Sequence, residues 1–371
     1  MLRVCHIVSG DLWAGAEVMV YNLLKGLQHY EDLEPMAIIL NKGRLAEEIH
    51  KLGIKVHILD ETTLSFYEIT QTVKKLIKNQ PPDIIHSHRY KENILAYLGY
   101  RSLNGVRLIG TQHGMPEMDR GRAGLKHRII SKINFLILSR KFSHVVAVSR
   151  DIGRFFVREY GFKQEKVSVI HNGIEIPKMS RQRKDGDSFI IGSSGRLFPI
   201  KDYSFMVEIA KKILGTIGNI RFQLAGDGPE RSKIQALIQN YGLNGTFELK
   251  GHVEDISAFY RSLDLYLNTS IHEGIPISVL EAMAYGLPVV APKVGGLTEI
   301  LDDGVQGYLV SKRDPEAFAE KCFLVYKDSS LRRRMSQAAR DKVKQSFSVE
   351  KMVQQYYNLY LSNVFDHEKH L

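Results

Sequence analysis

Short apolar segments alternate with longer amphipathic segments along most of the chain. The first half contains the apolar runs RVCHIVS, MAIIL, KVHIL, DIIHSH, RLIGTQH and HVVAVS, and each is followed by a stretch with helical spacing. The second half repeats the alternation with FIIGSSG, IRFQLAG, FELKG, DLYLNTS and LPVVAP. Runs rich in Val and Ile between helices are typical of parallel strands covered on both faces. The pattern therefore predicts an α/β protein with doubly wound, Rossmann-like sheets.

A polar break, KMSRQRKDGDS at residues 178–188, separates the two series of strands. A chain of 371 residues is also too long for one typical core and suits two domains of about 150 to 200 residues. We therefore expect one domain at residues 1–173 and another at 188–349, joined by a linker at 174–187. A last helical pattern at 350–371 is expected to return to the first domain.

The composition, 44% hydrophobic and 25% charged, is that of an ordinary globular protein. The first apolar stretch is too short for a signal peptide or a membrane span, which predicts a cytoplasmic protein. Cys5 and Cys322 share no metal-ligand or redox spacing, so we expect buried free thiols. No cluster of side chains has a recognisable metal-ligand spacing, and no cofactor is expected.

The segment SIHEGIPISVLEAMAYGLPVVAPKVGG places two glutamates eight residues apart. Glu273 and Gly274 lie in a loop after a strand, whereas Glu281 lies inside a helix that starts near Pro276 and ends before a glycine. The backbone N–H groups of Ile277 and Ser278 would attract a phosphate. A carboxylate accepts two hydroxyl hydrogen bonds. The alternative is that Glu273 only favours the helix dipole and that Glu281 is solvated, although small and apolar neighbours argue against a solvated Glu281.

This segment, with the AMAYGLPVVAPKVGGLTEIL that follows, resembles the signature of glycosyltransferase family 4, whose members are retaining enzymes with the GT-B fold. The resemblance covers nearly the whole chain and implies two Rossmann-like domains facing a central cleft. It implies that Glu281 binds the ribose hydroxyls of a nucleotide-sugar donor and that Glu273 lies against the transferred sugar. It also implies that the first domain binds the acceptor.

Two further loops of the second domain match the family. SSGRLFPIKD follows a strand, and there Arg196 and Lys201 can converge on one anion, with Gly195 just before them. The resemblance implies that this pair neutralises the donor pyrophosphate. The turn LAGDGPE contains Gly226 and Gly228, where glycines would let the nucleotide base approach. The alternatives are a solvated Arg–Lys surface and a plain turn.

The first domain contributes two strand-end loops. Gly15 begins a helix and permits a close backbone approach by an anion, although Ala14 stands where similar enzymes often have a second glycine. His113 follows another strand, and the resemblance implies that it contacts the transferred sugar without acting as the base. A plain structural histidine is the alternative. IHNG at residues 170–173 marks the expected hinge.

The function expected from these motifs is retaining transfer of a sugar from a nucleotide diphosphate donor, favoured as UDP-linked, to an acceptor hydroxyl. Cell-surface polysaccharide or glycolipid biosynthesis is the expected setting. The resemblance implies same-face substitution, with the leaving diphosphate stabilised by cations and helix amides and no metal required. One alternative is a nucleotide-sugar epimerase of the same fold. The other is a basic nucleic-acid-binding protein, against which no recognition pattern appears.

The net charge of +10 is concentrated in residues 1–173, which carry 25 Lys and Arg against 17 Asp and Glu. Residues 120–141 contain seven cations and no acid. On a helical wheel the predicted core arc comprises Leu125, Ile129, Ile130, Ile133, Leu136 and Ile137. Phe135 and Leu138 then share the other face with cations, as in interfacial helices. We expect peripheral contact with an anionic membrane, with solvated cations as the alternative.

Overall fold

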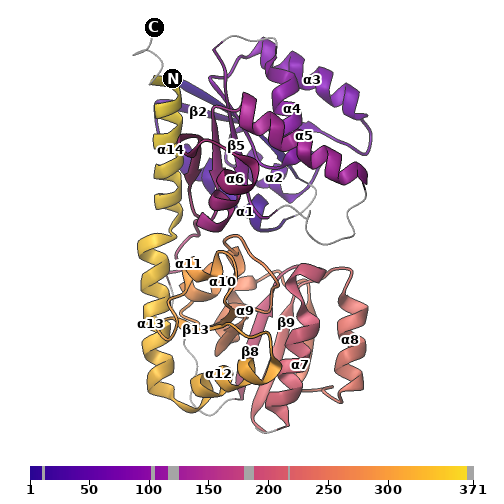
Figure 1. Ribbon diagram of the computed structural model, residues 1–371, viewed down its shortest axis with the longest axis vertical. Helices are drawn as coiled ribbons and strands as arrows, with labels where there is room; N and C mark the ends of the chain where they lie inside the picture. The colour runs from indigo at the N-terminus through magenta and orange to yellow at the C-terminus, as the bar shows by residue number, and fades with distance from the viewer. Residues whose placement is uncertain (11–12, 102–104, 116–124, 179–187, 216–217, 366–371) are drawn as a thin grey trace. The chain divides into compact units, whose positions relative to one another are not determined.

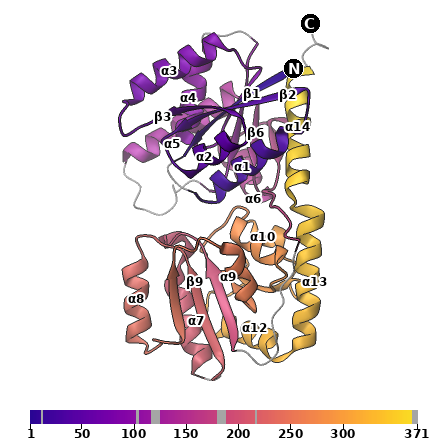
Figure 2. The ribbon, with the colours of Figure 1, turned by 180° about the vertical axis from the view of Figure 1, so that it is seen from behind.

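The chain forms two compact units, each built on one parallel sheet with helices on both faces (Figures 1 and 2). The computed structural model describes residues 1–10, 13–101, 105–115, 125–178, 188–215 and 218–365. One unit comprises Met1–Gly173 and Val349–Leu371, and the other comprises Ile174–Ser348. Helices interleaved with parallel strands confirm the predicted α/β class, and the architecture is that of the GT-B fold.

The first unit contains a seven-stranded parallel sheet in the order β3-β2-β1-β4-β5-β6-β7. Its strands are β1 (Leu2–Ser9), β2 (Leu33–Leu40), β3 (Lys55–Leu59), β4 (Ile84–Ser87), β5 (Arg107–Gln112), β6 (His144–Ala147) and β7 (Val167–Val169). Its helices are α1 (Gly15–Leu27), α2 (Arg44–Lys51), α3 (Phe66–Asn79), α4 (Tyr90–Tyr100), α5 (Leu125–Lys141), α6 (Arg150–Tyr160), η2 (Gln164–Lys166) and α14 (Val349–Phe365). All six predicted apolar runs form strands. The short strand β7 was not predicted.

The second unit contains a six-stranded parallel sheet in the order β10-β9-β8-β11-β12-β13. Its strands are β8 (Phe189–Ser194), β9 (Ile220–Ala225), β10 (Phe247–Gly251), β11 (Leu265–Leu267), β12 (Val289–Pro292) and β13 (Gly307–Val310). Its helices are η3 (Pro199–Lys201), α7 (Tyr203–Leu214), α8 (Arg231–Asn240), α9 (Ile256–Ser262), α10 (Ile277–Ala284), α11 (Leu297–Ile300), α12 (Pro315–Lys327) and α13 (Ser329–Ser346). The sequence predicted all of these strands except the edge strand β13.

The C-terminal helix α14 packs on the first unit, as predicted (Figure 1). Met352, Val353 and Tyr356 belong to the core between α1 and the sheet. Gly26 makes this packing possible, because a Cβ there would lie 2.4 Å from a methyl group of Val353. The expected linker starts at Ile174, whose N–H donates to the carbonyl of Phe347 in the second unit. Residues 179–187 of that linker lie outside the described residues.

Helix α5 presents the opposite face to the core from the one predicted. Phe135 and Leu138, expected on the outer face, are buried, whereas Ile129, Ile133 and Leu136 are each close to half exposed. Both arcs of this helix are rich in large apolar residues, so periodicity alone could not decide between them. Packing decides, because Gly110 on β5 leaves room for Leu138 and Phe135 stacks on Tyr160 at 3.9 Å between ring centroids.

Cys5 and Cys322 are buried free thiols, as predicted, and burial raises the pKa of Cys5 to about 12. Among the described helices, none combines the length and the apolar character that crossing a membrane requires.

Candidate active site

The predicted donor residues of the second unit lie at the carboxyl edge of its sheet. The loop after β8 carries Arg196 and Lys201, and the loop after β11 carries Glu273. These two strands are hydrogen-bonded neighbours, and the chain order of the sheet reverses between them. Open α/β sheets bind ligands at this switch point, beyond the carboxyl ends of the strands. The two loops are joined directly, since the N–H of Ile271 donates to the carbonyl of Ile200 at 2.9 Å.

Glu273 and Lys201 form an ion pair. The Lys201 ammonium lies 2.6 Å from Glu273 Oε1, and the Ser270 hydroxyl donates to the same oxygen at 2.5 Å. The side chains are 23% and 10% exposed, which places the pair at the edge of the protein interior. Two donors on Oε1 leave Oε2 of Glu273 available to a hydroxyl group. An ammonium has three N–H donors, so Lys201 can hold Glu273 and still bind a phosphate oxygen.

Glu281 lies on the second turn of α10, as predicted, with its carboxyl group held by a tyrosine. The Tyr260 hydroxyl donates to Glu281 Oε2 at 2.8 Å and also lies 2.8 Å from Ser194 Oγ. Desolvation raises the pKa of Glu281 to about 7, and the Tyr260 hydrogen bond opposes this shift. Hydrogen bonds from ligand hydroxyl groups would stabilise the charged form of this carboxylate, because they replace the water lost on burial. Tyr260 was not predicted, because it comes from α9, outside any motif.

Helix α10 begins shortly after Glu273 in the chain. Pro276 is the N-cap residue, and Gly286, with φ of 75°, follows the helix at its other end. Ile277 and Ser278 form the first turn, whose N–H groups have no carbonyl partner within the helix. Such a turn attracts an anion. Its predicted role in binding the diphosphate stays a prediction.

Arg196 is exposed and stacks over the ring of Phe198, with its guanidinium carbon 4.9 Å from the ring centroid. It has no ion-pair partner in the described part of the chain. The cation is therefore available to an anionic ligand, and its predicted contact with the donor stays a prediction. Its convergence with Lys201 on one diphosphate remains a prediction.

The predicted glycines of this unit have a structural reason to be glycines. A Cβ on Gly226 would lie 2.0 Å from the carbonyl oxygen of Gly195, and one on Gly228 would lie 2.7 Å from that of Leu197. The turn at 226–228 therefore packs directly on the Gly195–Leu197 backbone, and the N–H of Leu197 donates to Asp227 at 2.9 Å. These glycines hold the Arg196 loop in position, whereas room for a nucleotide base stays a prediction.

Two glycines without a predicted role support the Glu273 loop. A Cβ on Gly296 would lie 1.6 Å from the carbonyl oxygen of Gly274, and the N–H of Gly296 donates to the carbonyl of Glu273 at 3.0 Å. Gly295 has φ of 48° and would meet the same Glu273 carbonyl. The pair Gly295–Gly296 after a strand was the available sequence signal, since consecutive glycines allow backbone to pack on backbone.

In the first unit, the loop after β1 leads into α1 at Gly15, as predicted. The buried Glu17 on this helix pairs with Arg89 at 2.5 Å and accepts from the N–H of Ala14. The ion pair links the start of α1 to the start of α4. Contact of Gly15 with a donor stays a prediction.

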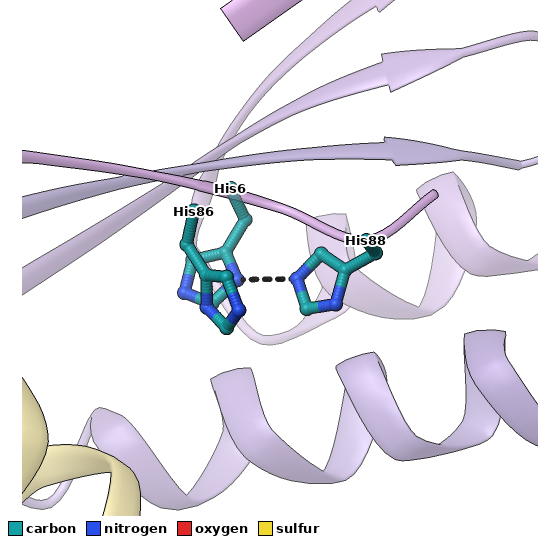
Figure 3. Close-up of side chains that lie close together, drawn as sticks. All are labelled: His6, His86 and His88. Carbon is teal, nitrogen blue, oxygen red and sulfur yellow. Dashed lines mark hydrogen bonds between the residues drawn. The ribbon is translucent and has the colours of Figure 1, made fainter. Parts of the chain in front are cut away.

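His113 follows β5, at the carboxyl edge of the first sheet, and ends a chain of histidine rings. Figure 3 shows the contact between His6 and His88 at the other end of this chain, with His86 beside it. His6 Nδ1 lies 3.1 Å from His88 Nε2, and His88 Nδ1 lies 3.3 Å from His113 Nε2. The strand register explains the cluster, because His6 pairs with His86 across β1 and β4, and His88 follows two residues after His86. The alternate histidines of DIIHSH were the sequence signal for this cluster, although no role was predicted for them.

Burial keeps these rings neutral. It lowers the pKa of His6 and of His113 to about 3 and the pKa of His88 well below the usual value. Each N···N contact needs one N–H and one lone pair, so the three rings share one direction of donation. His113 Nδ1 at the end of the chain is buried without a hydrogen-bond partner. It can donate to, or accept from, a sugar hydroxyl, and its low pKa makes this ring a weak proton acceptor, which argues against a role as base.

The nitrogens of His6, His86 and His88 lie within 4.8 Å of one another, the geometry of a possible metal site. Both ring nitrogens of His86 are already engaged, with Tyr360 at 2.7 Å and Thr111 at 2.8 Å. A metal ion would have to break one of these bonds inside a closed core. The three residues fit a structural network better than a metal centre.

The expected hinge residues lie at the boundary between the units. Gly173 is the last residue of the first unit before the chain enters the second. Its N–H donates to the sulfur of Met352 and its carbonyl accepts from Asn22. His171 and Asn172 precede it.

Two doubly wound sheets, with cations and carboxylates at the switch point of the second, make up the architecture of the GT-B type, and the matches to known families identify this protein as a GT-B glycosyltransferase. Residues 13–177 match the family described as Glycosyltransferase Family 4, and residues 176–342 match the family described as Glycosyl transferases group 1. The chain belongs to glycosyltransferase family 4.

The chain is 26% identical over 304 residues, 78% of each chain, to UDP-Gal:alpha-D-GlcNAc-diphosphoundecaprenol alpha-1,3-galactosyltransferase of Escherichia coli. It is 27% identical over 305 residues to N-acetyl-alpha-D-glucosaminyl L-malate synthase of Bacillus anthracis, covering 75% of this chain and 74% of the relative. Among solved structures, Anabaena HepE in complex with UDP and glucose has a TM-score of 0.84 at 20% identity, covering 98% of this chain and all of HepE.

Proposed function

We propose that the protein transfers a sugar from a UDP-linked donor to an acceptor hydroxyl with retention of configuration. The observation that carries the proposal is the Lys201–Glu273 pair beside the first turn of α10, at the switch point of the second sheet. A diphosphate there meets Lys201, Arg196 and backbone N–H groups. UDP is favoured because relatives with UDP in their names include the Escherichia coli galactosyltransferase and the crystallised HepE.

In the proposed reaction, Glu281 accepts the ribose hydroxyls and Glu273 Oε2 accepts a hydroxyl of the transferred sugar. His113 Nδ1 makes a further hydrogen bond to that sugar. The bond between the anomeric carbon and the diphosphate oxygen breaks while the acceptor oxygen bonds to the same face. The proton of the acceptor hydroxyl passes to the diphosphate, and UDP leaves. Lys201 and Arg196 stabilise the charge that grows on the leaving group, so the proposal requires no metal ion.

The acceptor side of the proposal is glycan biosynthesis at a membrane surface. The Escherichia coli relative is named for a diphosphoundecaprenol acceptor, which is lipid-linked. Helix α5 adds support, because Ile129, Ile133 and Leu136 are exposed and share one face with the exposed cations Lys132 and Arg140. At 100° per residue these five side chains fall within an arc of about 100°. We propose that this face contacts the anionic inner surface of the cell membrane.

The experiment is thermal stabilisation of the full chain by a panel of UDP-, GDP- and ADP-sugars, with a chelator present throughout. Stabilisation by UDP-sugars above the others supports the donor assignment. Nuclear magnetic resonance of the product made from the stabilising donor then gives its anomeric configuration. Inversion would overturn the retaining mechanism, and an epimer formed from donor alone would favour an epimerase.

A further inference from the structure

The chain of histidine rings from His6 to His113 can carry its protons in only two ways. His6 Nδ1 lies 3.1 Å from His88 Nε2, and His88 Nδ1 lies 3.3 Å from His113 Nε2. A neutral imidazole has one N–H and one lone pair, so the position of the proton on the middle ring fixes both neighbours. Either all three rings are protonated at Nδ1, or all three are protonated at Nε2.

Charged rings are disfavoured in this chain. Burial lowers the pKa of His88, and the neighbouring histidines and Arg89 lower it further. Burial also lowers the pKa of His6 and of His113 to about 3. The two neutral arrangements are therefore the ones to compare.

The two arrangements differ in which end of the chain carries an N–H without a partner. With protons at Nε2, that N–H belongs to His6, and with protons at Nδ1 it belongs to His113. His6 Nε2 and His113 Nδ1 are both buried and have no hydrogen-bond partner among the described residues. A buried donor without an acceptor carries an uncompensated desolvation cost. The surroundings of the two ends therefore decide between the arrangements.

The His6 end of the chain is closed. His6 is fully buried, and its ring centroid lies 4.9 Å from that of His86 (Figure 3). His86 already uses both of its nitrogens, with Tyr360 at 2.7 Å and Thr111 at 2.8 Å, so it has no lone pair to offer His6 Nε2. Unpartnered N–H groups are rarer in protein interiors than unpartnered acceptors. A lone pair at His6 Nε2 is therefore favoured over an N–H.

The His113 end lies at the surface of the same unit. His113 follows β5 at the carboxyl edge of the sheet and is partly exposed. A small displacement of its ring brings Nδ1 to water or to a ligand oxygen, and ligands of open α/β sheets bind beyond this edge. The N–H can find an acceptor here but not at His6, so protonation at Nδ1 throughout the chain is favoured.

We infer that His6 and His88 are positioning residues that fix His113 as a hydrogen-bond donor through Nδ1. The ligand atom that meets His113 must then offer a lone pair, as a hydroxyl or ring oxygen of a sugar does. His113 cannot take a proton at this nitrogen. The protonation of the chain is independent of the proposed function, whereas a sugar as the ligand rests on it.

Nitrogen-15 nuclear magnetic resonance of the full chain, labelled at histidine, tests the protonation directly. Protonated and unprotonated ring nitrogens resonate at well separated frequencies, and single histidine substitutions assign the signals. In the parent protein without ligand, His6, His88 and His113 should each be protonated at Nδ1 and unprotonated at Nε2. Protonation of His113 at Nε2 in the parent would overturn the inference.

A substitution two rings away should reverse the chain. His6→Met offers His88 only an acceptor, because a thioether has no hydrogen to donate. His88 should then donate from Nε2 to the sulfur and accept at Nδ1, so that His113 becomes protonated at Nε2. His6→Gln supplies an amide N–H to His88 in place of the ring N–H and should keep His113 protonated at Nδ1.

His57→Met is the matched control, because it makes the same substitution at a partly buried histidine on β3 of the same sheet. It should leave His113 protonated at Nδ1. The signal of His144, whose ring bonds to Ser168 outside the chain of rings, reports whether each variant is folded. A folded His6→Met that keeps His113 protonated at Nδ1, or a reversal in His6→Gln as well, would contradict the role of His6.

Calorimetry with UDP and UDP-glucose connects the protonation to the ligand. The affinity of His6→Met for UDP-glucose should fall about tenfold, because the donor to the sugar is lost, while its affinity for UDP and both affinities of His6→Gln should stay at the parent values. Reversal without any change in UDP-glucose affinity would overturn the link between this donor and the sugar. Absence of nucleotide binding by the parent would contradict the proposed function and leave the protonation result standing.

Discussion

Lys201 and Glu273, 72 residues apart in the chain, meet at 2.6 Å where two neighbouring strands end. The pair joins the cation assigned to the leaving diphosphate to the carboxylate assigned to the transferred sugar. Neither side chain can therefore be changed without disturbing the other. Charge that develops on the diphosphate would alter the interaction between Glu273 and the Lys201 ammonium group that both would share.

Lys201→Ala and Arg196→Ala should each lower turnover of the UDP-sugar about 100-fold, because charge grows on the leaving group in the transition state. If both cations bind one diphosphate, the fold loss of turnover in the double variant should be smaller than the product of the fold losses in the two single variants. Initial rates with a saturating acceptor measure this. Arg221→Ala, which removes an exposed cation from β9, is the control and should leave turnover unchanged. Near-normal rates for both single variants would make this loop a solvated surface.

Glu281→Ala should weaken the binding of UDP-glucose by about 1 to 3 kcal/mol, since two charge-assisted hydrogen bonds to the ribose are lost. Isothermal titration calorimetry gives the affinity, and circular dichroism shows whether the fold is intact. Glu320→Ala, on the exposed surface of α12, should bind UDP-glucose as the parent does. An unchanged affinity of Glu281→Ala for UDP-glucose would contradict the proposal that Glu281 binds the ribose hydroxyls.

The pH dependence of stability should also report on Glu281. Its pKa is raised to about 7 in the folded chain, so the folded state binds this proton more tightly than the unfolded state. The resulting stabilisation is full below about pH 4.5 and is lost as the pH rises towards 7. Glutamine does not titrate, so the free energy of unfolding of Glu281→Gln should rise relative to that of the parent as the pH increases. Allowing for partial solvent exposure, we expect this difference to grow by about 1 to 2 kcal/mol between about pH 5 and pH 8. Urea unfolding at both pH values measures the gain, and an equal effect at both would contradict the shift.

The exposed face of α5 should bind anionic membranes. The protein should sediment with vesicles of phosphatidylglycerol and phosphatidylcholine at low salt and should dissociate from them as the salt concentration rises. It should not sediment with vesicles of phosphatidylcholine alone. Each Lys or Arg near an anionic surface contributes on the order of 1 kcal/mol. Lys132→Glu with Arg140→Glu should abolish sedimentation, and Ile133→Ser with Leu136→Ser should weaken it.

The matched control for this face is Lys75→Glu with Lys78→Glu, which makes the same charge change on the exposed surface of α3. Those variants should still sediment. Failure of the parent protein to bind anionic vesicles at low salt would favour an acceptor free in solution.

Gly296→Ala should destabilise the second unit by about 2 kcal/mol or more, because the added Cβ would lie 1.6 Å from the carbonyl oxygen of Gly274. The backbone must move, and Glu273 moves with it, so turnover should fall as well. Gly218→Ala meets no atom within 4 Å and is the control. Equal stability of the two variants in urea unfolding would show that the Glu273 loop tolerates displacement.

Most of the strands, the two units and the positions of Glu273 and Glu281 could be predicted because they follow from local patterns: apolar runs, a helix start at proline and a glycine after the helix. The role of Tyr260 could not, since it depends on which helices become neighbours. The alternate histidines of DIIHSH were visible in the sequence, but their contacts with His6 and His113 depend on which strands become neighbours. The α5 face shows the same limit. Both of its arcs are apolar, and only the space above Gly110 shows which arc is buried.

The first unit is assembled from two pieces of chain, with α14 supplying Met352 and Tyr356 to a core that begins at Leu2. During synthesis, the ribosome therefore completes the second unit before the first has its last helix. The usual order, in which the N-terminal domain folds first, should be reversed here. Until α14 emerges, the nascent N-terminal region would present part of an apolar core that chaperones could recognise.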